Sequence, residues 1–121
     1  MSETKTLREI IRERLDNIWH RIKSMGPDEV SKELVELSAL IGTLGEKIVD
    51  FDQALANKQL EIWQEKEEIS AKEVEIRSKI TQEYQDLQKA KVLLTAIIET
   101  IRSLKYRLRV LKGEREGTIN L

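Results

Sequence analysis

A row of basic side chains near the C-terminal end of the chain has the spacing to bind a polyanion. Arg102, Lys105, Arg109 and Lys112 recur at three- and four-residue steps, which puts them on one flank of a helix. Tyr106 lies between them. Cations in a row can neutralise successive phosphates of a nucleic-acid strand, and an aromatic ring can stack on a base. The row is therefore a candidate contact for single-stranded DNA.

The same row has a second interpretation within the fold. Seven acidic residues and two lysines fall in positions 28–52, whereas six basic residues and two glutamates fall in positions 100–116. In an antiparallel hairpin these segments lie side by side, so the cations would pair with the acids and complement the negative end of their own helix. A net charge of −1 and the single interleaved aromatic residue favour this second interpretation.

Residue types that support catalysis or metal binding are sparse. The chain has no cysteine and one histidine, His20, with Asp16 one turn before it. A zinc site in an enzyme normally needs three protein ligands, usually with more than one histidine or a cysteine. No glycine-rich phosphate loop or Gly-x-Ser-x-Gly elbow is present either. We therefore expect no metal, no cofactor and no enzymatic activity.

One enzyme pattern is partly present. The MazG-like nucleotide pyrophosphatases are all-α and bind magnesium through Glu-x-x-Glu followed later by Glu-x-x-Asp. Glu33 and Glu36 match the first half, but the second half is missing. A helix seam through Leu34 and Leu37 would also turn Glu36 away from the core, whereas magnesium needs converging carboxylates. A magnesium-dependent nucleotide pyrophosphatase is therefore the less favoured alternative.

The elements that would position these residues are predicted from apolar periodicity, which indicates an all-α chain in a single domain over 1–121. A first helix is expected over 3–25. Gly26 would end it in the left-handed conformation, and a proline would open the next helix. That second helix, over 28–67, carries an unbroken apolar seam: Val30, Leu34, Leu37, Ile41, Leu44, Ile48, Phe51 and Leu55.

The remaining chain is predicted to return along the second helix. Ser70, with a glutamate three residues later, is the expected N-cap of a tip helix over 71–79, and Thr81 offers a weaker cap after it. A returning helix over 82–112 would be capped by a glycine and followed by a flexible tail over 113–121. The expected fold is a long antiparallel helical hairpin, a coiled coil, with an N-terminal helix and a short tip helix.

Several positions predict self-association. Gly42 and Gly45 lie in a stripe of small residues beside the main seam, which suggests the close approach of another helix or, alternatively, a local bend. Ile98 widens the apolar surface of the returning helix beyond a two-helix seam. Trp63, in a polar stretch, would mark an interface if exposed. We expect a homo-oligomer, with a dimer favoured because twofold association is the commonest arrangement.

The sequence predicts neither secretion nor insertion into a membrane. No stretch reaches the roughly 20 apolar residues that span a bilayer, and Met1–Ile10 has no apolar core of signal-peptide length. We therefore expect a cytoplasmic protein with no membrane contact and no small-molecule substrate.

Parts of the chain resemble small uncharacterised helical proteins of tailed bacteriophages, which are often encoded near recombination and replication genes. The segments that carry the resemblance are Ser38–Glu46, Glu83-Tyr84 and Ile101–Leu111. It extends over roughly residues 30–112, and Leu104–Val110 is its most specific part. The resemblance implies a setting in the host cytoplasm and a protein partner of the recombination or replication type. It implies no catalytic residues.

Two functions follow as hypotheses. In the first, the chain is a non-enzymatic phage-type accessory protein that self-associates and binds a recombination or replication component, with single-stranded DNA touching the basic row. In the second, it is a protein-interaction module that inhibits a host enzyme or defence factor through the hairpin surface and Trp63.

Overall fold

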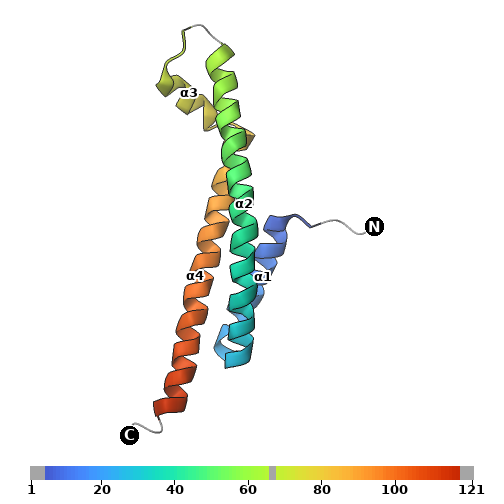
Figure 1. Cartoon of the computed structure of the whole chain (residues 1–121), viewed down its shortest axis with the longest axis vertical. Helices are drawn as coiled ribbons and strands as arrows, with labels where there is room; N and C mark the ends of the chain where they lie inside the picture. The colour runs from blue at the N-terminus through green and yellow to red at the C-terminus, as the bar shows by residue number, and fades with distance from the viewer. Residues whose placement is uncertain (1–4, 66–67, 118–121) are drawn as a thin grey trace. The chain divides into compact units, whose positions relative to one another are not determined.

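The chain folds into helices throughout its described part. In a computed structural model, the structure describes residues 5–65 and 68–117, with the backbone alone over 114–117. The helices are α1 (Leu7–Arg21), the short 3-10 helix η1 (Ile22–Ser24), α2 (Pro27–Glu65), α3 (Ala71–Ser78) and α4 (Gln82–Gly117), labelled in Figure 1. No strand occurs among these residues, and α2 and α4 pack closely. The predicted all-α helical hairpin is confirmed.

The chain divides into two compact units, and each of the long helices α2 and α4 contributes residues to both. Unit 1 is Met1–Gly42 with Leu93–Leu121, and unit 2 is Thr43–Val92. Unit 1 therefore holds α1, η1, the first part of α2 and the last part of α4. Unit 2 holds α3 and the remaining parts of α2 and α4.

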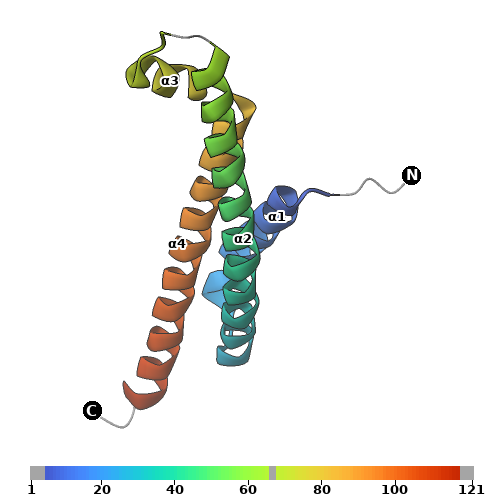
Figure 2. The same cartoon turned by 45° about the horizontal axis from the view of Figure 1, so that its top comes forward.

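Three helices build the core of unit 1. Figure 2 shows α1 beside the first part of α2, and a hydrogen bond described below links α1 to α4. Each burial of a large aliphatic side chain stabilises the fold by about 1.5–3 kcal/mol. The apolar side chains with almost no exposure come from all three helices and from the link before α2: Ile11, Ile18, Met25, Val30, Leu37, Ile97 and Leu104.

The start of α1 is set by a side-chain cap. Thr6 has extended backbone, and its Oγ1 accepts a hydrogen bond from the backbone N–H of Glu9 at 3.2 Å. Such a cap satisfies one of the free N–H groups of the first turn. The helix therefore begins at Leu7, later than the predicted start at residue 3.

The break between α1 and α2 differs from the prediction. After Arg21 the chain tightens into η1, and Met25 then leaves the helical path with φ −74° and ψ 134°. Gly26 has no positive φ, so the expected left-handed glycine cap is wrong. Extended backbone at Met25 makes the break, and Pro27 opens α2 as predicted, where its missing N–H costs nothing.

Unit 2 contains the predicted tip helix with its predicted caps. Ser70 Oγ accepts a hydrogen bond from the backbone N–H of Glu73 at 3.1 Å, and Thr81 Oγ1 accepts one from Tyr84 N–H at 3.2 Å. The side chains of Ile62, Ile69 and Val74 form a small buried cluster that holds α3 within this unit. Gln59 also donates a hydrogen bond to Ser78 across the unit, at 3.3 Å.

The C-terminal end of α4 corrects another boundary. We expected the helix to end at Lys112, with Gly113 as its cap. Instead α4 continues through Gly113 to Gly117, because Gly113 keeps a negative φ and the backbone remains helical. Of the predicted tail, residues 118–121 lie outside the described part of the chain.

Candidate nucleic-acid interface

The basic row on α4 faces solvent. Arg102, Lys105, Arg109 and Lys112 are all exposed, and the side chain of Arg102 is 71% accessible. Arg102 and Lys112 are ten residue steps apart on one helix, which corresponds to about 15 Å along its axis. All four lie in unit 1, so a single compact unit presents the row.

Few of these cations are neutralised. Arg102 pairs with Glu99, one turn earlier on α4, at 3.0 Å. No described residue forms an ion pair or hydrogen bond with Lys105, Arg109 or Lys112. An exposed pair such as Arg102–Glu99 is worth at most about 1 kcal/mol, so Arg102 can exchange its partner readily. The row therefore offers up to four cations to a ligand.

The acids at the start of α2 are paired with α1. Arg14 contacts Glu33 at 3.3 Å and also pairs with Glu36, while Arg21 contacts Glu29 at 3.3 Å and Glu33 at 3.4 Å. Glu33 is the most enclosed of these acids, at 8% exposed. The carboxylates of α2 therefore tie α1 in place.

This arrangement contradicts one part of the favoured interpretation of the row, the pairing of its cations with α2. We predicted that the cations of α4 would pair with the acidic start of α2. Within the described residues, no such ion pair joins the two helices. The prediction was wrong because Arg14 and Arg21 of α1 form the ion pairs with those acids. The two arginines are seven residues apart, and each follows a buried isoleucine, Ile11 or Ile18, by three positions. From this spacing the sequence could have revealed the α1 contact.

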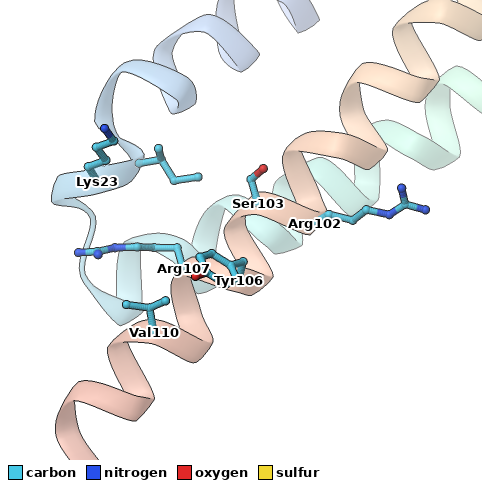
Figure 3. Close-up of a pocket in the computed structure, with 7 residues that line it drawn as sticks. Lys23, Arg102, Ser103, Tyr106, Arg107 and Val110 are labelled. Atoms are coloured by element: carbon cyan, nitrogen blue, oxygen red, sulfur yellow. The ribbon is translucent and has the colours of Figure 1, made fainter.

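Tyr106 and a neighbouring hollow complete the surface. Tyr106 is 64% exposed, as a ring that stacks on a base must be. It lies at the edge of a hollow of about 530 Å³ between η1 and α4, shown in Figure 3. We call this the η1–α4 hollow. Its lining residues are Ile22, Lys23, Arg102, Ser103, Tyr106, Arg107 and Val110.

Arg107 fixes one wall of the hollow. Its Nε donates a hydrogen bond to the backbone carbonyl of Met25 at 3.4 Å, which links α4 to the chain just after η1. A second link holds α1 to α4, where Trp19 Nε1 donates to Thr100 Oγ1 at 3.0 Å. Thr100 is fully buried and donates in turn to the carbonyl of Ala96. Sequence reasoning found neither link nor the part played by Lys23.

The residues considered for magnesium do not gather around a cation site. Glu33 and Glu36 converge on the guanidinium of Arg14, which supplies the positive charge that a metal would bring. His20 is exposed, and its Nδ1 lies 2.7 Å from the carbonyl of Asp16. Among the described residues, no group of three or more His, Cys, Asp or Glu side chains could hold a metal ion.

The predicted interface residues are scattered over both units. Gly42 is exposed, and apart from neighbouring residues in the chain and the local backbone of α2, no atom lies within 4 Å of where a Cβ would stand on Gly42 or Gly45. No helix of the described chain therefore approaches closely at these glycines, contrary to the simplest expectation from the small stripe. Trp63 is 48% exposed and Ile98 is 37% exposed. Each remains accessible in the isolated chain.

One cation in unit 2 is firmly partnered. Lys58 donates a hydrogen bond to Glu61 at 3.3 Å. This bond raises the pKa of Lys58, and the negative charges of Glu61, Glu83 and Glu65 raise it further. A partnered lysine of this kind contrasts with Lys105, Arg109 and Lys112.

Comparison with known proteins adds no further constraint. No family model matches the chain, and no curated protein or solved structure matches it either. No helix in the described ranges is long and apolar enough to cross a membrane.

Proposed function

We propose that the chain is a non-enzymatic accessory protein that binds single-stranded DNA through the basic row of α4. The observation that carries the proposal is the pairing of the α2 acids with α1, which leaves Lys105, Arg109 and Lys112 exposed and without a described partner. Lysine and arginine in such a row gain affinity for a strand by releasing its counterions. The exposed Tyr106 adds a stacking surface.

The wider setting belongs to the same proposal. As a phage-type protein in the host cytoplasm, the chain would self-associate and bring its DNA-binding row to a recombination or replication component. Ile98, Gly42 and Gly45 are accessible and so are free to meet a second copy. A dimer would present two rows and raise the effective concentration of sites along one strand.

The direct test is a binding titration with a labelled 25-residue oligothymidylate at about 50 mM salt, where electrostatic binding is strong. The unmodified protein should bind, and the double variant Lys105→Glu/Arg109→Glu should bind at least ten times more weakly. The matched control Lys47→Glu/Lys89→Glu makes the same charge change at exposed lysines outside the row and should bind nearly as well as the unmodified protein. Absence of binding by the unmodified protein would rule out direct DNA contact.

A second candidate function rests on a different surface. Trp63 and Leu60 lie one turn apart on α2, in unit 2, with exposures of 48% and 56%. Exposed tryptophan is enriched among residues that dominate protein interfaces. In this alternative the chain inhibits a host enzyme or defence factor. Capture of such a protein from host lysate, lost with Trp63→Ala but retained with Lys105→Glu/Arg109→Glu, would favour it over DNA binding.

A further inference from the structure

The η1–α4 hollow combines an apolar wall with a rim of positive charge. Ile22 and Val110 supply aliphatic surface, and Tyr106 supplies an aromatic ring. Lys23, Arg102 and Arg107 are its three charged lining residues, and no acidic residue lines it. A ligand that fits this chemistry has a flat apolar part joined to an anion.

The hollow and the basic row share an edge. Arg102 and Tyr106 are four residues apart on α4 and so lie one above the other on the helix. Ser103, Arg107 and Val110 follow on the next face around α4, toward η1, as the side chains in Figure 3 show. A strand that follows the row from Lys112 to Arg102 therefore passes the mouth of the hollow.

Lys23 extends the positive surface beyond α4. It is exposed on η1, and no described residue pairs with it. Arg107 donates a hydrogen bond to the carbonyl of Met25, so it forms part of the wall of the hollow and is less available to bind a ligand. Lys23 and Arg102 are consequently the cations available to the phosphates on either side of a residue seated in the hollow.

We propose that the η1–α4 hollow receives one base of the single-stranded DNA bound along the row. The base packs against Tyr106 and the aliphatic side chains, while Lys23 and Arg102 contact its flanking phosphates. A volume of about 530 Å³ lies within the range of roughly 300–1,000 Å³ usual for small-ligand sites, which accommodates a nucleotide. This inference rests on the proposed function, because the row must first hold the strand.

The experiment compares two strands that carry the same phosphates. A labelled 12-residue oligothymidylate and an abasic 12-mer of the same backbone are titrated at about 50 mM salt. The unmodified protein should prefer the strand with bases roughly ten-fold, as expected for stacking of a base on an aromatic ring. Phosphate contacts along the row alone give no such preference, since the phosphates are the same. Stacking of a base on the exposed Tyr106 outside the hollow gives a preference that does not depend on the space in the hollow.

Three variants locate the preference in the hollow. Ser103→Leu fills the space in the hollow, and Tyr106→Ala removes the ring. Each variant should bring the ratio of the two affinities, with bases over abasic, close to one. The affinity of each variant for the abasic strand should stay within about two-fold of that of the unmodified protein. Lys23→Gln should weaken both strands and lower the salt slope by about 0.7, the share of one phosphate contact. Ser31→Leu, at an exposed serine on α2, is the matched control for the added leucine. Circular dichroism verifies that each variant remains helical.

The outcomes separate this inference from the proposed function. Equal binding of both strands by the unmodified protein, or a preference that survives Ser103→Leu, overturns the base site and leaves the row intact. Occupancy of the hollow by polyglutamate instead is tested by competition. If polyglutamate displaces the oligothymidylate from the unmodified protein but not from Ser103→Leu, the base site is overturned in favour of a site for an acidic peptide. If neither strand binds, the row and the base site fall together.

Discussion

Two charged surfaces in unit 1, the acids at the start of α2 and the cations near the end of α4, differ in how far their charges are paired within the fold. The acids at the start of α2 meet arginines of α1, so that Glu33 is enclosed between Arg14 and Arg21. The cations near the end of α4 keep their exposure, and only Arg102 has an acidic partner among the described residues. The comparison teaches that a net charge of −1 conceals a strongly basic local surface.

The largest effect is expected on the α2 side of the comparison. Glu33→Lys places a third cation between Arg14 and Arg21 at a position only 8% exposed. Loss of a buried pair costs about 3–5 kcal/mol, but both arginines are partly exposed, so we expect about 2–3 kcal/mol lower unfolding free energy. Urea denaturation followed by circular dichroism measures it.

The control for this variant lies on the same helix. Glu29→Lys breaks only the pair with Arg21, where the side chain of Glu29 is 58% exposed, and should cost less than about 1 kcal/mol. Equal destabilisation by the two variants would contradict the view that enclosure of Glu33 holds α1.

A moderate effect is expected on the α4 side, as a gain of function. Glu99→Gln removes the described acidic partner of Arg102 and leaves the arginine in place. Because the row then presents four cations without an acidic partner among the described residues, its affinity for oligothymidylate should rise about two- to three-fold at low salt. Fluorescence anisotropy gives the affinity. A decrease would show that Arg102 depends on Glu99 to hold it in a binding orientation.

The smallest effect concerns Lys58, one of the partnered cations of unit 2. Its folded pKa is raised above 10.5, chiefly by the hydrogen bond to Glu61, so its stabilising contribution is complete below that pH and is lost only as the pH rises through the raised pKa. Melting temperatures of the unmodified protein and Lys58→Met should therefore differ by one constant amount between pH 7 and pH 9. A difference that varies within this interval would contradict the assignment.

Sequence reasoning reached the helices because their signals are local. The alternating seam through Val30 and Leu37 lies in the core, and the caps at Ser70 and Thr81 form the expected hydrogen bonds. Each depends on residues within a few positions of one another. The glycines misled the boundary predictions, because Gly26 and Gly113 both keep negative φ where a left-handed cap was expected.

The surface was harder to predict because its contacts join distant parts of the sequence. Whether the α4 cations pair depends on which helix reaches the α2 acids, and the choice of α1 follows from the burial of Ile11 and Ile18 beside Arg14. The η1–α4 hollow likewise joins Lys23 to Tyr106, which no periodicity connects. Pairing of the row with α2 could be predicted only as one of two alternatives, and no ion pair among the described residues joins the row to α2.

The central claim is that the cations of α4 are available to the phosphates of a strand. The most direct measurement is the dependence of oligothymidylate affinity on salt between about 50 and 200 mM, where four phosphate contacts give a slope of log K against log salt of about −3. Lys105→Glu/Arg109→Glu should reduce that slope by about half. A slope that the double variant leaves unchanged, or no binding at 50 mM salt, would contradict the claim.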